Sequence, residues 1–229
     1  ELEKAEQCEK MRKTQKTFLL EAYVPTEMRE GVEGALNEAA SAVLYEFSQP
    51  SEDEQPPTLL KNNKVVKNFE AVTDMYSPVN YREFDPNTVM AFFYSLFLGF
   101  IMGDVIYGLM MSVIGGFVYF RSKRETGMKK LAGVFAVGGI FAILWGFLFN
   151  SFLGMAALPH TVMPDAMSGR YSLMGIQIPS VLVISMIIGI VQLGAGYACR
   201  AVQCWRRGDT WGGIFDGVSW TMFMVGVLL

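Results

Sequence analysis

The sequence predicts a mainly α-helical, polytopic membrane protein with a small cytoplasmic α/β lobe and a coiled-coil end at its N-terminus. Hydrophobic residues make up 52% of the 229 residues and charged residues only 18%, against roughly 25% charged residues in a typical soluble domain. The charges are unevenly spread, since 1–87 contain 17 acidic and 10 basic residues and 88–229 contain 5 and 9. This division predicts a water-soluble part followed by a membrane part. It excludes a disordered chain and a disulfide-rich mini-domain.

The front of the chain is expected to form part of a cytoplasmic head. Glu, Lys, Ala, Gln and Leu favour a helix over 1–17, either a solvated helix end or the last turns of a coiled-coil arm. The run at 18–24 is a strand candidate, and Thr26 is placed to cap a helix that continues to about Ala40. The apolar and aromatic run at 41–47 predicts a second strand. Together these elements make one small α/β lobe.

Composition divides the chain into three regions. Residues 1–50 hold the end of the head, 51–87 form a linker and the approach to the membrane, and 88–229 form the transmembrane domain. The linker follows from the acidic, proline-rich stretch 48–58, which disfavours helix and strand. The chain has no initiator Met and ends within an apolar run, so we expect it to be truncated at both ends.

The second half of the chain contains apolar runs that predict membrane-spanning helices. Asp104 and Asp216 are the only charged residues within the cores of these runs. Roughly 20 apolar residues cross a bilayer as a helix, and the absence of a two-residue alternation excludes a membrane barrel. The expected helices are 88–103, 105–120, 131–153, 179–203 and a truncated helix at 211–229.

The basic loops predict the topology of these helices. Loop 121–130 contains five bases and one acid, and 204–209 is the next basic linker. Both loops are expected on the cytoplasmic side, together with the N-terminal part. Residues 88–120 must then cross twice, as a tight hairpin of two short helices that turns near Gly103–Asp104. The alternative is one long tilted helix that leaves loop 121–130 outside.

Four polar residues interrupt the apolar segments and are the candidate functional residues: Asp104, Asn150, Gln192 and Asp216. Ionisable or polar groups within a membrane suggest an ion or proton path. Each residue also has a structural alternative. These are a cap at the hairpin turn for Asp104, a place near a helix end for Asn150, an interhelical hydrogen bond for Gln192, and an N-cap at the cytoplasmic interface for Asp216.

Other chemistry is not indicated. The sequence has no phosphate-binding Gly-Lys-Ser/Thr loop, no nucleophile–base pair and no Cys/His cluster, so we expect no catalytic residue, no cofactor, no metal site and no nucleic-acid binding. Cys8, Cys199, Cys204 and His160 are interpreted as structural. The spacing Gly99-x-x-x-Gly103 predicts a close helix-packing face, as do Gly138-Gly139 and Gly194-Ala195-Gly196.

One long segment, 56–108, resembles the membrane-boundary signature of the stator membrane subunit of V/A-type ATPases and ATP synthases, called subunit I or subunit a. The residues that carry the resemblance are Pro56-Pro57, Leu60, Asn62, Tyr76, Pro78, Tyr81, Glu83, Asp85-Pro86, Phe92-Phe93, Gly103-Asp104 and Tyr107-Gly108. Ile106 departs from the pattern, where the family usually has glycine. The segments 18–25, 145–154 and 215–220 are also similar to family segments.

The resemblance implies the static half of a rotary motor. Such a subunit translocates protons or sodium ions against a rotating c ring of proteolipid subunits and anchors the peripheral stalks. It has no catalytic residues of its own. The implied partners are the c ring, the peripheral stalk subunits, the other ATPase subunits and the lipid bilayer, in a multi-pass protein of a prokaryotic plasma membrane. The family's essential arginine is expected beyond Leu229, and Arg200 is interpreted as a snorkelling residue at a helix end.

Two other functions stay open at this point. One is an unrelated transporter or channel with a cytoplasmic lobe, which predicts an internal repeat that the sequence does not display. The other is a non-functional fragment that acts only as a membrane scaffold.

Overall fold

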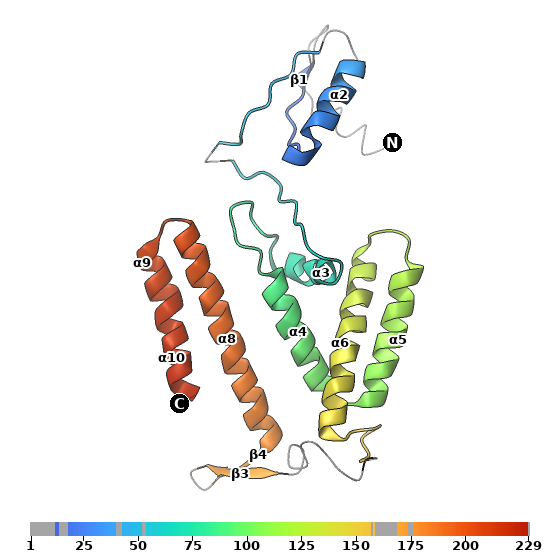
Figure 1. The fold of residues 1–229 in the computed structure, drawn as a ribbon, viewed down its shortest axis with the longest axis vertical. Helices are drawn as coiled ribbons and strands as arrows, with labels where there is room; N and C mark the ends of the chain where they lie inside the picture. The colour runs from blue at the N-terminus through green and yellow to red at the C-terminus, as the bar shows by residue number, and fades with distance from the viewer. Residues whose placement is uncertain are drawn as a thin grey trace. The chain divides into compact units, whose positions relative to one another are not determined.

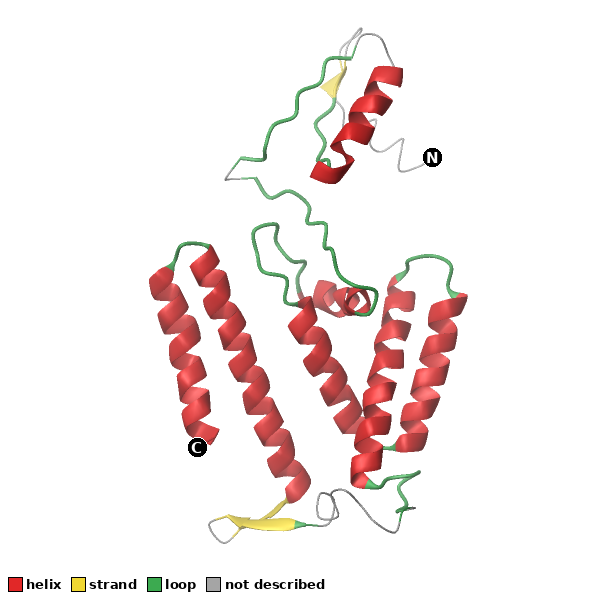
Figure 2. Cartoon of the chain, in the orientation of Figure 1, coloured by secondary structure: helices red, strands yellow, loops and turns green. Residues whose placement is uncertain are grey.

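The computed structural model describes residues 12–13, 18–39, 43–51, 54–156, 158, 169–173 and 176–228. The chain divides into two compact units, Glu1–Leu59 and Leu60–Leu229. Helices dominate the described residues, as Figures 1 and 2 show. The mainly α-helical fold class is therefore confirmed.

The first unit contains two very short strands and one helix. Strands β1 (Arg12–Lys13) and β2 (Phe18–Leu19) pair antiparallel. The helix predicted over 1–17 is therefore wrong at β1, where pairing with β2 replaces local helix propensity. The rest of 1–17 lies outside the described residues. The strand predicted over 18–24 is confirmed only at β2.

A helical turn and a helix follow Pro25 in the first unit. The 3₁₀ turn η1 (Thr26–Met28) leads directly into helix α2 (Arg29–Ala39). Pro25 occupies the cap position of η1, and Thr26 is already inside the turn. The predicted Thr26 side-chain cap is therefore wrong, although the predicted helix and its end are confirmed.

The strand predicted over 41–47 is wrong for 43–47, which form no strand. A strand needs a partner for its backbone hydrogen bonds, and the described part of the chain offers none here. Side chains hold the segment to α2 instead: Asn37 donates to the Tyr45 hydroxyl at 3.4 Å, and the Arg29 guanidinium lies 4.9 Å from the centroid of the Phe47 ring. Residues 41 and 42 are outside the described residues.

The second unit begins with four helices. They are α3 (Val66–Tyr76), α4 (Asn87–Met102), α5 (Val105–Arg121) and α6 (Gly127–Phe149). The predicted turn at Gly103–Asp104 is confirmed, because α4 ends at Gly103 and Asp104 begins α5. The two arms are not a tight pair, however. In Figure 1 the yellow helix α6 lies between them, and both arms pack mainly against α6.

Close helix packing against α6 depends on glycines. A Cβ atom on Gly99 would lie 2.5 Å from the backbone carbonyl carbon of Phe141, and one on Gly108 would lie 2.7 Å from the Ile143 nitrogen. A Cβ atom on Gly139 would be just as close to Ser112 of α5. The predicted packing role is therefore confirmed at Gly99 and at Gly138-Gly139. Gly103 also lies close to α6, since a Cβ atom there would be 3.2 Å from the Phe149 ring, and its φ of +48° ends α4.

A small apolar core joins α3 to α4 and α6. It consists of Val66, Phe69, Val72, Ala91 and Val134. Phe69 is fully buried, and its ring meets Tyr94 edge-on at 6.0 Å between centroids. Helix α3 therefore packs across the N-terminal ends of α4 and α6, as Figure 1 shows.

The rest of the second unit is a β-hairpin followed by a helical pair. Strands β3 (Arg170–Leu173) and β4 (Ile176–Pro179) pair antiparallel and lead into α8 (Ser180–Arg206). The short helix α9 (Thr210–Gly212), the π-helical turn η2 (Gly213–Val218) and α10 (Ser219–Leu228) then run back along α8. This β-hairpin is not predicted by the sequence.

The helix bounds differ from the predicted ones by a few residues. Helix α6 begins at Gly127 and ends at Phe149, because Asn150 adopts the left-handed conformation with φ 55°. Helices α6 and α8 have the length and apolar composition of a membrane crossing, and α4 and α5 are shorter apolar helices. The Asp209 side chain caps α9 by accepting from the Gly212 nitrogen. The predicted N-cap role of Asp216 is therefore wrong, since Asp216 lies inside η2.

Candidate functional site

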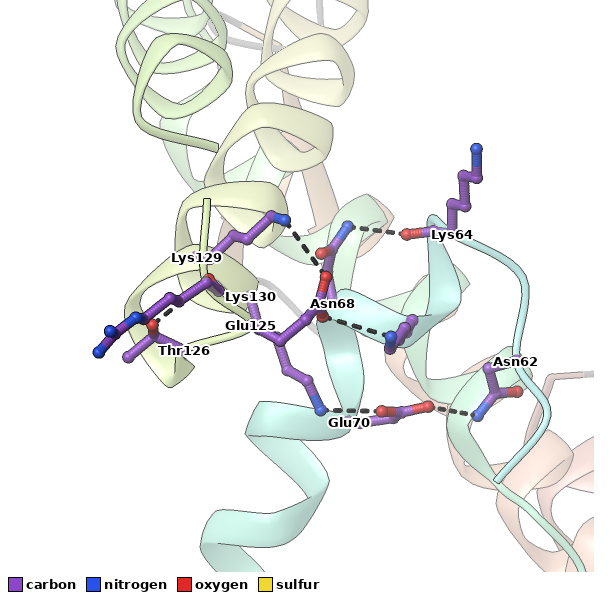
Figure 3. Close-up of polar contacts among 10 residues, drawn as sticks. Asn62, Lys64, Asn68, Glu70, Glu125, Thr126, Lys129 and Lys130 are labelled. Carbon is purple, nitrogen blue, oxygen red and sulfur yellow. Dashed lines mark hydrogen bonds and ion pairs between the residues drawn. The ribbon is translucent and has the colours of Figure 1, made fainter. Parts of the chain in front are cut away.

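The segment before α4 contributes to a polar network of Asn62, Glu70, Asp85 and Lys130, here called the approach network. Asn62 Nδ2 donates to Glu70 Oε1 at 3.1 Å and to Asp85 Oδ2 at 2.8 Å. Lys130 Nζ, from the first turn of α6, lies 2.9 Å from Glu70 Oε2. Figure 3 shows Glu70 held between Asn62 and Lys130. The network therefore ties α3, α6 and the residues before α4 together.

The approach network is placed where burial makes its charges costly to separate. Glu70 is 7% exposed as a residue, and the side chains of Glu70 and Lys130 are 10% and 22% exposed. A buried carboxylate is stable only when charges or hydrogen bonds compensate it. Asp85 extends the network by accepting from the Asn87 backbone nitrogen at 2.9 Å, in the first turn of α4.

A second polar contact joins α3 to α4 inside the apolar core. The Thr73 hydroxyl donates to Asn87 Oδ1 and lies 3.3 Å from Met90 Sδ. Asn87 is fully buried, and within the described chain its Nδ2 has no hydrogen-bond partner. Asn68, also on α3, lies against Gly133 of α6, where a Cβ atom would come within 2.4 Å of the amide carbon. The start of α4 is therefore set by contacts with α3.

Glu125 forms a further set of ion pairs beside the approach network. Glu125, in the loop between α5 and α6, pairs with Lys129 at 3.2 Å and with Lys67 of α3 at 3.3 Å, and Figure 3 shows Glu125 beside Lys129. The hydrogen bonds from Lys129 and Lys67 lower the pKa of Glu125 from its ordinary value. Glu125 therefore pairs with two lysines, and its single negative charge offsets one of their two positive charges.

A third contact links the segment before α4 to the turn after α8. Arg207 Nη2 donates to Glu83 Oε1 at 2.7 Å, and Arg206 lies 5.4 Å from the centroid of the Phe84 ring. Hydrogen bonds from Asn80 and then from Arg207 lower the pKa of Glu83, while partial burial opposes them. This contact places the α8–α9 turn at the same end of the unit as the start of α4.

The turn between α4 and α5 is built around Asp104, which is 4% exposed. Asp104 Oδ1 accepts from the backbone nitrogens of Ile106 at 2.9 Å and Tyr107 at 3.2 Å, and so caps α5. Oδ2 accepts from the Ser151 hydroxyl at 2.8 Å and the Gly154 nitrogen at 3.0 Å. Asp104 therefore joins the turn to the residues that follow α6.

Asn150 lies beside this turn and organises the same segment. It ends α6, its Nδ2 donates to the Leu158 carbonyl, and its Oδ1 accepts from the Leu158 nitrogen, both at 2.9 Å. The placement near a helix end is confirmed for Asn150. The cap at the hairpin turn is confirmed for Asp104.

Gln192 and Asp216 line one open groove along α8, η2 and α10. The groove also contains Arg200, whose Nη2 lies 3.7 Å from Asp216 Oδ2, and the stacked pair Tyr197–Trp220 with centroids 5.7 Å apart. Both charged side chains are about half exposed, at 52% and 57%. Gln192 makes no side-chain hydrogen bond across helices within the described ranges, so that predicted role is wrong there. No described residue lies close to Gly194 or Gly196, so their predicted packing role is wrong within the described residues.

The polar candidates therefore separate into two places. Asp104 accepts from Ser151, the residue after Asn150, whereas Gln192 and Asp216 line the groove along α8, η2 and α10. The signature residues are distributed over three joints. Asp85 lies in the approach network with Pro86 at the N-cap of α4, Glu83 lies in the contact with Arg207, and Gly103, Asp104 and Gly108 lie at the α4–α5 turn. Tyr81 and Tyr107 are 56% and 49% exposed.

The sequence did not predict the charge pairs, among them Glu70–Lys130, Arg200–Asp216 and Arg207–Glu83. Lys130 can be singled out in the sequence because it lies in the first turn of an apolar helix, but its partner Glu70 is 60 residues away. Arg200 lies six residues before the end of α8, so its pairing with Asp216 replaces simple snorkelling. Within the described ranges no group of three His, Cys, Asp or Glu side chains is placed to bind a metal. Cys199 and Cys204 are free thiols, and Cys8 and His160 lie outside the described residues.

The geometry of these joints coincides with a family match. The profile of the V-type ATPase 116kDa subunit family matches residues 6–159, which include the approach network and the α4–α5 turn. The chain belongs to this family. Among its relatives is an A-type ATP synthase subunit I of Pyrococcus horikoshii, 33% identical over 100% of this chain and 35% of the relative. A subunit I of Methanocaldococcus jannaschii is 33% identical over 62% of this chain and 21% of the relative.

The family match also reaches eukaryotes. A V-type proton ATPase 116 kDa subunit a 3 of Caenorhabditis elegans is 28% identical over 61% of this chain and 18% of the relative. The chain spans about a third of the length of the subunit I relatives that it matches over nearly its whole length. The resemblance given by the signature at 56–108 is therefore confirmed at the level of the V-type ATPase 116 kDa subunit family.

Proposed function

We propose that this member of the V-type ATPase 116 kDa subunit family is a membrane-embedded stator subunit of a rotary ATPase or ATP synthase. In this role it takes part in proton or sodium translocation against a c ring and helps to anchor peripheral stalks. The single observation that carries the proposal is the family match over residues 6–159. The relatives are named subunits of an A-type ATP synthase and a V-type proton ATPase.

The surface of the second unit supports placement in a bilayer. Large apolar side chains are exposed along α4, α5, α6, α8 and α10, which a soluble monomer rarely displays over such a length. Examples are Ile101, Phe117, Ile140, Met186 and Phe223, which are 54–76% exposed. In hydrocarbon these faces need no protein cover, and helices satisfy their own backbone hydrogen bonds.

The contacts at one end of the unit support a double crossing by α4 and α5. Lys130 at the start of α6 pairs with Glu70, and Arg207 after α8 pairs with Glu83, before α4. Both basic loops therefore lie at the end where α4 begins. In the proposed topology this end is cytoplasmic, because basic loops favour that side. The single-crossing alternative would separate loop 121–130 from the start of α4.

The polar residues receive different roles in this proposal. Asp104 and Asn150 position the turn and the segment after α6, since their oxygens are occupied by local donors. Gln192 and Asp216 are the better candidates for a polar path, because they line an open groove with Arg200. We do not assign the motor's ion-exchanging arginine to Arg200.

Purification of the tagged protein from its native membranes tests the proposed function. The expected result is co-purification with a proteolipid ring and with nucleotide-hydrolysing subunits, and extraction only with detergent. Recovery from the membrane without either partner would contradict the stator role and favour an unrelated transporter. Recovery from the soluble fraction would contradict both.

A further inference from the structure

Two kinds of basic residue lie at the end of α5, in the loop that follows it and in the first turn of α6. Lys129 and Lys130 are matched by Glu125 and Glu70 at 3.2 and 2.9 Å. Arg121, Lys123 and Arg124 are exposed, and the structure gives none of them an acidic partner among the residues it describes. We call these three residues the loop cluster. Their charges are therefore available to a ligand outside the chain.

The loop cluster stands directly at the end of an apolar surface. Arg121 is the last residue of α5, and the side chains of Phe117 and Phe120 just before it are 69% and 85% exposed. Tyr119, on the same turn, has Lys129 over its ring at 5.3 Å. Aromatic residues followed by basic residues are typical of the membrane–water interface, where the ring meets acyl chains and the cation meets headgroups.

We propose that Arg121, Lys123 and Arg124 bind the headgroup of an anionic phospholipid, with its acyl chains along the exposed face of α5. The proposal rests on the proposed membrane placement of the chain. The adjoining apolar face favours a lipid over an acidic protein segment, because a lipid matches both the charge and the hydrocarbon surface. Short clusters of Lys and Arg beside a membrane helix attract anionic lipids.

The neighbouring cations do not offer the same site. Lys67 and Lys129 share Glu125, which holds both side chains in ion pairs and offsets one of their two charges. Arg207 is held by Glu83, and Arg206 lies over Phe84. The contrast between matched and unmatched cations at one end of the unit makes the proposal testable by two variants of equal charge.

The experiment measures phosphatidylglycerol binding to the full chain, purified in detergent, by native mass spectrometry. Each basic side chain near a charged lipid surface contributes roughly a fivefold factor, so the double variant Lys123→Gln/Arg124→Gln should bind phosphatidylglycerol roughly 25-fold more weakly. The control variant Lys67→Gln/Lys129→Gln removes the same charge from paired positions and should change binding much less. Phosphatidylcholine should bind both variants as it binds the unaltered chain.

Three results would overturn the proposal. The first is equal weakening by the two variants, which indicates general charge and not the loop cluster. The second is unchanged phosphatidylglycerol binding by Lys123→Gln/Arg124→Gln. The third is displacement of the lipid by inorganic phosphate at similar concentration, which indicates a site for a free anion. Co-purification with the ring is measured on the same variants, so the lipid site can fail while the stator role stands.

Discussion

The Glu70–Lys130 pair gives the sharpest prediction about how α3 is held. Replacing Lys130 with Met removes the 2.9 Å contact and leaves Glu70 with Asn62 as its remaining partner in the approach network. A hydrogen bond to a charged group contributes roughly 1.5–3 kcal/mol, and breaking a fully buried ion pair costs roughly 3–5 kcal/mol. Because Lys130 is 22% exposed, water screens part of this loss. We expect the Lys130→Met variant to destabilise the docking of α3 by roughly 2 kcal/mol.

Hydrogen–deuterium exchange of the α3 amides measures this effect directly. A loss of about 2 kcal/mol corresponds to roughly 30-fold faster exchange when α3 opens locally. Lys129→Met is the matched control, because it changes the adjacent lysine, whose partner Glu125 is exposed. The control should leave α3 exchange nearly unchanged.

A double variant separates the lost pair from the lost lysine. In Lys130→Met/Glu70→Gln no carboxylate is left without its cation, so α3 should exchange more slowly than in Lys130→Met alone. Equal exchange in Lys130→Met and Lys129→Met would refute the reasoning. So would a double variant that exchanges faster than Lys130→Met.

Three further predictions concern the other joints. Gly108→Ala should destabilise the unit by roughly 1–3 kcal/mol in thermal unfolding, because its Cβ meets α6 backbone at 2.7 Å; Gly116→Ala, with open space, should not. Asp104→Ala should lower the free energy of unfolding by roughly 2–4 kcal/mol in the same assay, because it removes a cap and two further hydrogen bonds. Asp104→Asn should lower it less, and equal losses in the two variants would contradict the role of the carboxylate. Hydrogen bonds from Asn80 and Arg207 lower the pKa of Glu83 from 4.5, so the ionised Glu83 stabilises the folded unit above pH 4.5 and this stabilisation is lost as the pH falls through the lowered pKa. Glu83→Gln should flatten this part of the curve of unfolding free energy against pH, and an unchanged curve would contradict the contact.

The sequence predicts those parts of the fold that depend on local chemistry. Gly103 tolerates a left-handed conformation, and Asp104 accepts from the next backbone nitrogens, so a turn between two apolar helices follows from adjacent residues. The length and composition of α6 and α8 are likewise local properties. The strand predicted over 41–47 is absent at 43–47, because strand formation depends on a partner, which composition does not reveal.

The approach network could not be predicted in the same way. Glu70 and Lys130 are 60 residues apart, and nothing near either of them identifies the other. The pairing follows only once α3 packs across the start of α6. Arg200 and Asp216 meet for a similar reason, since their contact depends on α10 running back along α8. The signature at 56–108 points to the family, and the structure gives its polar residues separate structural tasks.

The double crossing by α4 and α5 is tested most directly by labelling from one side of the membrane. Single cysteines at Gln55, Lys123 and Met155, in a chain whose own cysteines are replaced, are exposed to a membrane-impermeant thiol reagent in sealed vesicles. We predict that Gln55→Cys and Lys123→Cys react from the same face and Met155→Cys from the other. Labelling of Gln55→Cys and Lys123→Cys from opposite faces would contradict the topology.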